Sequence, residues 1–78
     1  MCMPQPRKYT VQLFPEPEGG FTVRVPALPE IVTYGETKTE ALANATEAIE
    51  LVLEVRTADG QPIPDDVVPV LETLTVAA

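Results

Sequence analysis

Residues 37–60 read TKTEALANATEAIELVLEVRTADG, and this stretch carries the strongest local signal in the sequence. Thr37 and Glu40 have the spacing of a capping box, in which the threonine hydroxyl accepts from the Glu40 amide and the Glu40 carboxylate returns to the Thr37 amide. The run is rich in Ala, Leu and Glu and has no glycine or proline before Gly60, which can take the left-handed conformation of a helix cap. We therefore predict a helix over residues 37–58.

The predicted helix is apolar over about half of its circumference, which is more than packing on one sheet face requires. Leu42, Ile49 and Leu53 fall on one line beside Ala45 and Val52, and we expect this line to face the core. Four glutamates occupy the opposite side. A further apolar flank consists of Ala41, Ala48, Leu51 and Val55. Either the C-terminal segment folds back over this flank, or another molecule covers it.

Before the helix, alternating apolar and polar residues predict a β-hairpin. The alternation runs from Tyr9 to Leu13 and again from Phe21 to Val25. Residues 15–20, PEPEGG, end the first strand, because proline lacks a backbone donor and paired glycines accept positive φ. Two prolines predict an extended segment at residues 26–29, and residues 31–34 favour a third short strand.

After the helix, residues 62–66 predict a rigid connector and residues 67–76 a last strand. Val70, Leu74 and Val76 would lie on its inner face. The predicted order is β-β-β-α-β, an α+β fold in which one helix packs on a small antiparallel sheet.

The length of 78 residues allows one domain. We expect it to span residues 7–78, after a flexible arm at residues 1–6 and with no C-terminal DNA-binding module. A lone domain of this size hides only about 60% of the surface of its unfolded chain, so association with a partner or with copies of itself is favoured.

The chain is acidic, with 12 acidic and 5 basic residues and a net charge of -7. Such a field repels phosphate backbones and attracts basic surfaces, so we expect no direct DNA or RNA binding and a basic protein as partner. The alternative is that the acidity only keeps a small domain soluble.

Composition argues against catalysis. There is no histidine or serine, and the single cysteine, Cys2, allows neither an intramolecular disulfide nor a nitrogen and sulfur zinc site. We expect no cofactor, no metal and no enzymatic activity; a metal-dependent nuclease is the remaining enzymatic alternative. Without an apolar segment long enough to span a bilayer or an evident signal peptide, we expect a cytoplasmic protein that does not bind membranes.

A series of short motifs resembles the HicB-like antitoxin family. The motifs are Tyr9-Thr10-Val11, residues 15–23 of the hairpin, Val25-Pro26-Ala27-Leu28-Pro29, Tyr34-Gly35-Glu36-Thr37, residues 40–45, Ala48-Ile49-Glu50-Leu51 and residues 60–64. Glu30 stands where the family often has glycine.

The resemblance implies a partial ribonuclease-H-like fold and a role in a toxin-antitoxin system. Such domains bind and neutralise a small basic toxin, HicA, which cleaves messenger RNA, and they commonly form dimers or higher oligomers. The first strand has no carboxylate of the kind that holds the metals of ribonuclease H, so the resemblance implies no nuclease activity.

We expect partner or oligomer contacts at two places, the extra flank of the helix and the acidic hairpin loop. The residues are Ala41, Ala48, Leu51, Val55, Glu16 and Glu18. The alternative function is a homo-oligomeric interaction module without a toxin partner.

Overall fold

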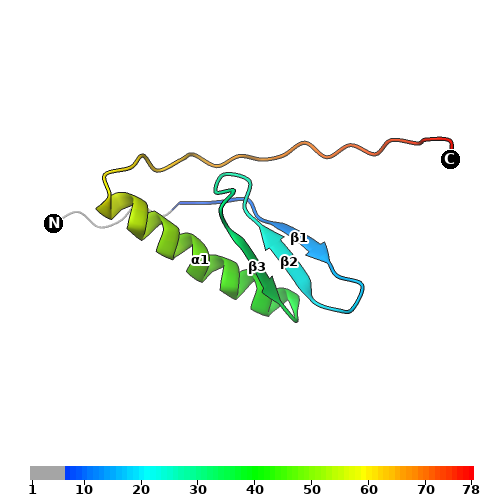
Figure 1. Ribbon diagram of the computed structural model, residues 1–78, viewed down its shortest axis with the longest axis horizontal. Helices are drawn as coiled ribbons and strands as arrows, with labels where there is room; N and C mark the ends of the chain where they lie inside the picture. The colour runs from blue at the N-terminus through cyan, green and yellow to red at the C-terminus, as the bar shows by residue number, and fades with distance from the viewer. Residues whose placement is uncertain (1–6) are drawn as a thin grey trace.

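A computed structural model describes residues 7–78 and shows a three-stranded antiparallel sheet in the order β1-β2-β3, followed by one helix (Figure 1). The strands are β1 at Gln12–Pro15, β2 at Phe21–Arg24 and β3 at Val32–Gly35, and the helix is α1 at Lys38–Ala58. This arrangement confirms the predicted α+β class. The arm expected at residues 1–6 lies outside the described residues.

The hairpin between β1 and β2 forms as predicted. The amide of Glu16 donates to the carbonyl of Gly20 over 3.0 Å, and Gly19 and Gly20 take φ values of 104° and 83°. β1 begins later than the alternation indicated, at Gln12. The side chains of Tyr9 and Val11 nevertheless pack against the core, so the alternation predicted burial correctly and overestimated the hydrogen-bonded strand.

The segment between β2 and β3 is folded into two consecutive turns, and the expectation of an extended segment was wrong. The amide of Leu28 donates to the carbonyl of Val25 over 2.9 Å, and the amide of Ile31 donates to the carbonyl of Leu28 over 3.0 Å. Pro26 and Pro29 each occupy the second position of a turn, where the fixed φ of proline is favourable. The turns bury Val25, Leu28 and Ile31 in one core cluster.

The helix begins at its predicted cap. The hydroxyl of Thr37 accepts from the amide of Glu40 over 3.1 Å, while the Glu40 carboxylate accepts from the amide of Glu36 over 3.3 Å and not from that of Thr37. At the other end, Gly60 has a φ of 71° and its amide donates to the carbonyl of Thr57 over 3.1 Å. The helix therefore ends where the sequence indicated.

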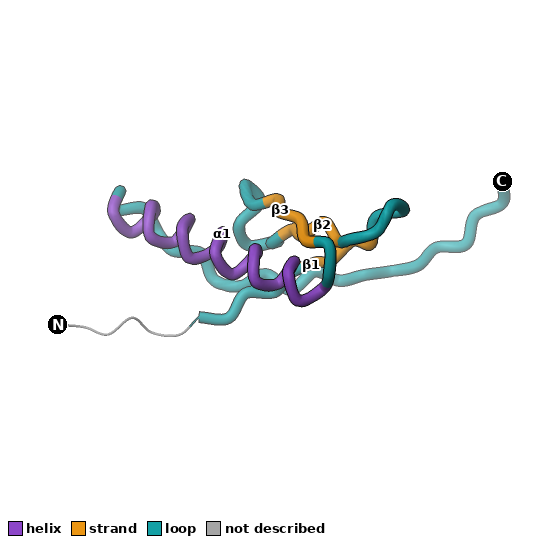
Figure 2. Tube along the Cα trace, turned by 90° about the horizontal axis from the view of Figure 1, so that it is seen from below, coloured by secondary structure: helices purple, strands orange, loops and turns teal. Residues whose placement is uncertain are grey.

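The helix packs on one face of the sheet, chiefly on β3 and β2 (Figure 2). Ala41 and Ala45, at 0% and 2% exposure, contact Val23 in the core cluster of the sheet. The predicted core line is confirmed in most of its members, because Ala45 is buried and Ile49, Val52 and Leu53 pack against the second core cluster. Its exception is Leu42, which is 37% exposed. Alanine lets the helix backbone approach the strands closely, which turns the larger leucine line towards the side of the sheet.

The predicted last strand is not formed. Residues 61–78 contain no helix or strand and run extended past the hairpin (Figure 1). The chain diverges from β1 beyond Asp66, so residues 67–76 have no neighbouring strand with which to form a ladder. The segment does not cover the extra helix flank either, since Leu51 and Val55 remain 61% and 51% exposed.

Candidate protein-interaction surfaces

An open apolar groove of about 1180 Å³ lies between α1 and the segment that precedes β1. We call it the helix groove. Its apolar lining consists of Tyr9, Val11, Leu42, Ala45, Ile49, Leu53, Ala58 and Ile63. The groove exists because α1 lies over β2 and β3, which leaves the helix side nearest β1 without a covering strand. Leu42, Ile49 and Leu53 of the predicted core line therefore border this groove, while Ile49 and Leu53 also pack against the second core cluster.

The helix groove also has polar groups at its edge. Glu50 and Glu54 come from α1, and Arg7 comes from the segment before β1. An apolar floor with a charged rim is the usual character of a protein-binding surface, in which the apolar centre supplies affinity and the rim supplies orientation.

The solvent side of α1 forms a second surface, which we call the acidic helix face. Glu40, Glu47 and Glu54 are spaced seven residues apart, which places them on one line of the helix, and all three are exposed. Leu51 and Val55 lie beside this line with 61% and 51% of their surface exposed. The face therefore combines negative charge with accessible apolar contact area.

The six predicted interface residues fall into three environments. Ala41 is fully buried under the sheet and Ala48 packs against the second core cluster, so Ala41 has no surface to offer a partner in this chain. Leu51 and Val55 are exposed on the acidic helix face. The sequence assigned all four to one flank because the position of the sheet around the helix cannot be read from helical periodicity.

Glu16 and Glu18 lie in the hairpin loop, away from the C-terminal half of α1 (Figure 1). The carboxylate of Glu16 accepts from the hydroxyl of Thr22 over 2.6 Å, and the hydroxyl of Tyr34 donates to the carbonyl of Gly19 over 3.0 Å. These bonds stabilise the shape of the loop. The structure does not bring Glu16 and Glu18 together with the exposed residues of the helix.

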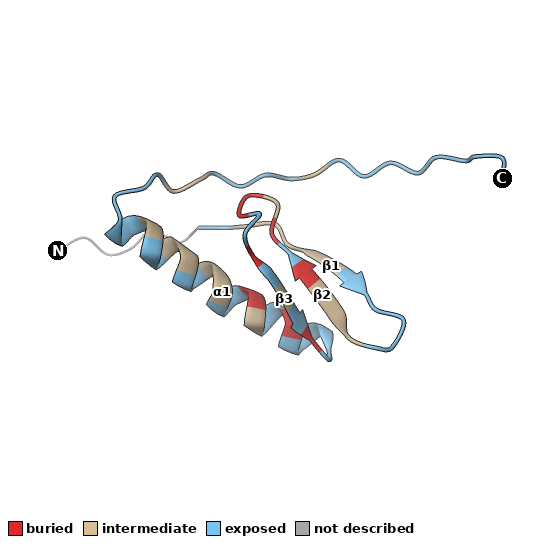
Figure 3. Cartoon of the chain, in the orientation of Figure 1, coloured by how far each residue is buried: buried red, intermediate tan, exposed pale blue. Residues whose placement is uncertain are grey.

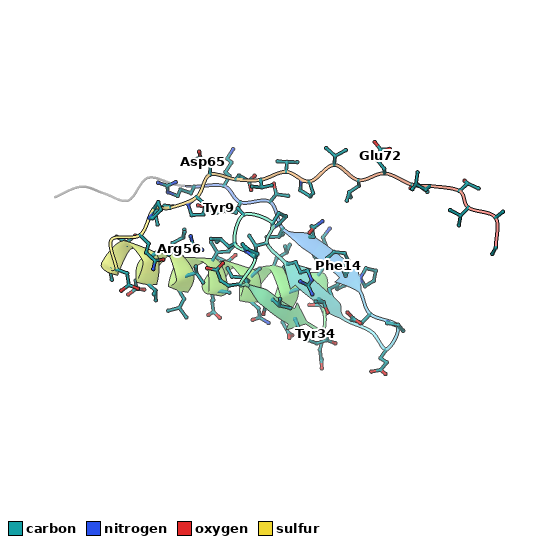
Figure 4. All side chains as sticks on the ribbon, turned by 45° about the horizontal axis from the view of Figure 1, so that its top comes forward. Tyr9, Phe14, Tyr34, Arg56, Asp65 and Glu72 are labelled. Carbon is teal, nitrogen blue, oxygen red and sulfur yellow. The ribbon has the colours of Figure 1, made fainter. Side chains whose placement is uncertain are left out.

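The connector after α1 is bonded to the segment before β1. The hydroxyl of Tyr9 donates to the carbonyl of Pro64 over 2.6 Å. The amide and hydroxyl of Thr10 donate to the two carboxylate oxygens of Asp66 over 2.8 and 2.7 Å. The amide of Thr10, followed by its hydroxyl, lowers the pKa of Asp66 below its ordinary value of 3.8. Figure 4 shows Tyr9 beneath the connector close to Asp65.

Beyond Asp66 the chain is exposed except at Pro69, which is half-buried (Figure 3). We call residues 67–78 the C-terminal tail. Its large aliphatic residues and their exposures are Val67 49%, Val68 71%, Val70 84%, Leu71 80%, Leu74 84% and Val76 78%. The alternation that predicted a strand is therefore present in an extended segment that has no partner within residues 7–78.

Arg56 joins the C-terminal end of α1 to the turns between β2 and β3. Its guanidinium lies 2.7 Å from the carboxylate of Glu30, and this hydrogen bond lowers the pKa of Glu30 below its ordinary value of 4.5. Glu30 occupies the position at which the resemblance led us to expect glycine, and the ion pair gives this substitution a structural role.

Two further findings concern residues 7–78. In this part of the chain, no three side chains of Asp, Glu or Cys gather into a group that could hold a metal ion. Of the helices in the described residues, none is long and apolar enough to cross a membrane.

Comparison with known proteins identifies the family. The family described as HicB_like antitoxin of bacterial toxin-antitoxin system matches residues 9–76, nearly the whole described chain. The chain belongs to the HicB-like antitoxin family. It is thus a HicB-like antitoxin of a toxin-antitoxin system.

Relatives of this HicB-like chain differ in length. UPF0150 protein Ta0767 of Thermoplasma acidophilum is 44% identical over 59 residues, which cover 76% of this chain and 86% of the relative. Antitoxin HicB of Escherichia coli K12 is 39% identical over 57 residues, which cover 73% of this chain and 41% of the relative. Antitoxin HicB 1 of Photorhabdus laumondii is 40% identical over 57 residues, which cover 73% of this chain and 37% of the relative. The chain thus aligns with less than half of each named antitoxin.

No solved structure matches the chain significantly. The partial ribonuclease-H-like fold that the resemblance implied therefore stays a prediction, whereas the α+β arrangement of sheet and helix is observed.

Proposed function

We propose that this HicB-like chain neutralises a small basic toxin of the HicA type, an mRNA-cleaving ribonuclease, by direct protein contact. The observation that carries this function is the family match over residues 9–76. The net charge of -7 supports it, because an acidic chain attracts a basic, RNA-handling protein and suppresses encounters with RNA itself.

The acidic helix face is the surface that we assign to the toxin. Its glutamates supply charge complementary to a basic protein, and the exposed side chains of Leu51 and Val55 supply apolar area that can be desolvated at the centre of an interface. By covering the RNA-binding surface of the toxin, the chain would block cleavage without chemistry of its own.

The direct test is a titration of the purified chain into a HicA-type toxin while the cleavage of a labelled RNA is followed. We expect cleavage to fall to the background level at saturating chain. Unchanged cleavage under these conditions would refute the proposal. A sample of the chain alone with RNA and magnesium measures whether it has any residual nuclease activity.

Charge reversal on the helix then tests the assigned surface. We expect the double substitution Glu47→Lys with Glu54→Lys to weaken toxin binding by about tenfold or more, because like charges would now face each other. The matched control is Glu16→Lys with Glu18→Lys in the hairpin loop, which makes the same change in net charge. Equal weakening by both pairs would show that net charge and not the acidic helix face determines binding.

A second candidate function is that of a homo-oligomeric interaction module. The observation that favours it is the exposure of six large aliphatic side chains in the C-terminal tail. The two functions are compatible, since self-association and toxin binding can use different surfaces.

A further inference from the structure

The C-terminal tail has the properties of a strand that lacks its sheet. Val68, Val70, Leu74 and Val76 fall on one face of the extended chain, interrupted by Glu72. The amide of Val67 donates to the carboxylate of Asp66. Beyond it, no backbone hydrogen bond joins residues 68–78 to the sheet or the helix within residues 7–78. An extended apolar segment with an unpaired backbone is suited to pairing with the edge of a sheet.

The connector holds the tail away from its own sheet. The bonds of Tyr9 to Pro64 and of Thr10 to Asp66 fix its base, and Pro62 and Pro64 stiffen the chain just before it. From this base the tail runs past the hairpin, and Glu72 is separated from the sheet and the helix (Figure 4). A rigid connector of this kind favours exchange between copies over folding back within one chain.

The helix groove provides a site of matching length and character. Ten extended residues from Val67 to Val76 span about 33 Å, and the helix from Leu42 to Ala58 spans about 24 Å. The groove lies beside the segment that leads into β1, and β1 is an edge strand because the sheet order is β1-β2-β3. A strand seated there could cover the leucine line of α1 and extend the sheet.

We propose that two copies of this chain exchange their C-terminal tails, each tail lying in the helix groove of the other copy and adding a strand beside β1. The exchange is reciprocal, so a two-fold dimer covers both tails and both grooves and closes on itself. The proposal rests on the homo-oligomeric state suggested above and not on toxin inhibition.

Charge favours a second copy over a basic protein as the partner of the tail. Residues 67–78 contain one charged side chain, Glu72, so the tail offers a basic partner almost no electrostatic attraction. A second copy offers the helix groove, whose apolar lining is accessible to solvent as the tail is, so both would lose exposed apolar surface on contact. Glu50 and Glu54 lie at the edge of the groove, whereas Glu40 and Glu47 of the acidic helix face lie outside its lining and stay accessible in the proposed dimer.

The first test measures the mass of the full chain by light scattering over a range of concentrations. We expect twice the chain mass of 8.4 kDa for the wild type. The double substitution Val70→Asp with Leu74→Asp should raise the dissociation constant of the dimer by about 100-fold or more, because it places two charges in an apolar interface. Both side chains are 84% exposed in the single chain, so folding should persist, which circular dichroism can verify.

Two control substitutions distinguish the tail from other exposed apolar sites. Val32→Asp alters a 54% exposed residue of β3, and Leu51→Asp alters a 61% exposed residue of α1. Both should leave the dimer intact. A wild-type monomer would overturn the homo-oligomeric state itself, whereas a dimer insensitive to the tail substitutions would overturn only the exchange.

Complementation tests reciprocity. Leu42→Asp at the mouth of the groove should weaken the dimer as the tail substitutions do. Mixing the Leu42→Asp chain with the Val70→Asp, Leu74→Asp chain should recover a heterodimer, because the first keeps an intact tail and the second an intact groove. Failure to recover it would contradict the exchange.

Hydrogen exchange distinguishes exchange between copies from folding back within one chain. The amides of residues 67–76 should be protected at high concentration and lose protection on dilution below the dissociation constant. Protection that does not depend on concentration would mean that the tail docks on its own chain and would overturn the proposal. A tail variant that stays dimeric but no longer inhibits toxin would also overturn it, in favour of a toxin-binding tail.

Discussion

At the scale of single residues, two threonines and one tyrosine make the hydrogen bonds that cap α1 and hold the connector after it. Thr37 caps α1 through its hydroxyl, while Tyr9 and Thr10 bind the connector that follows the helix. The contacts of Tyr9 and Thr10 join residues more than fifty positions apart in the sequence, and they define the point from which the C-terminal tail departs.

Acidification should release the base of the tail. The folded pKa of Asp66 lies below the ordinary 3.8, so the bonds to Thr10 stabilise the folded chain fully above that pH, and this contribution is lost as pH falls through the folded value. In a carboxyl NMR titration, Thr10→Val should raise the pKa of Asp66 towards 3.8. The control Thr39→Val, in the first turn of α1, should not change it. An unchanged value in Thr10→Val would contradict the assigned contact.

Gly35 allows α1 to approach the sheet. A Cβ at this position would overlap the backbone N and Cα of Ala41 and lie 2.8 Å from the carbonyl carbon of Glu40. We expect Gly35→Ala to lower the free energy of unfolding by about 1–3 kcal/mol or more, measured by urea denaturation, because backbone must move. Gly19→Ala has open space around its Cβ and should lose only about 1 kcal/mol, from its positive φ. Equal losses would contradict the packing.

At the scale of elements, the rotation of α1 about its axis is the feature that defines the surfaces. Small residues, Ala41 and Ala45, face the sheet, and the larger Leu42 and Leu53 line the helix groove. This rotation of α1 produces close packing under β2 and β3 and leaves the helix groove unfilled on the side of the segment before β1. The element with the clearest sequence signal therefore also provides both candidate interaction surfaces.

The cap of α1 can be tested without touching either surface. Thr37→Ala removes the acceptor for the Glu40 amide and should lower the free energy of unfolding by about 1 kcal/mol. Thr39→Ala, two residues on and inside the helix, should be neutral or slightly stabilising, because alanine has the higher helix propensity. Thermal or urea denaturation of both variants provides the measurement, and a larger loss in Thr39→Ala would contradict the assigned cap.

At the scale of the whole molecule, the acidic helix face and the helix groove are two surfaces of α1 that meet at Glu54. Glutamates and Leu51 lie on the solvent side of α1, whereas the nearly uncharged tail and the helix groove lie on the side nearest β1. Separate surfaces would allow a HicB-like antitoxin to bind a toxin while it associates with a second copy.

The separation makes a prediction for Leu51→Asp. We expect this substitution to weaken toxin binding by about tenfold or more, because binding would bury the new carboxylate at the centre of the acidic helix face. The mass of the chain alone in solution should not change. Calorimetry with a HicA-type toxin and light scattering of the chain alone measure the two effects. Loss of self-association with intact toxin binding would reverse the assignment of the surfaces.

The sequence alone determined the elements whose signals are local. The hairpin glycines, the Thr37 cap and the Gly60 terminus act through bonds between residues close in the chain, so the hairpin and the helix were predicted correctly. The family was also readable from motifs spread over the chain. The two turns after Val25 were missed because the prolines were taken to extend the backbone, although proline is equally favoured at the second position of a turn.

Only the tertiary structure decided which side of α1 meets the sheet and where the chain goes after Asp66. Helical periodicity gives the relative angles of side chains but not the position of the sheet around them, so it placed Ala41 on an accessible flank and Leu42 in the core. Alternation in residues 67–76 indicates a strand, but a strand exists only beside another with unpaired backbone groups. Whether such a neighbour is in reach depends on the bonds of Tyr9 and Thr10 to the connector, which no local pattern reveals.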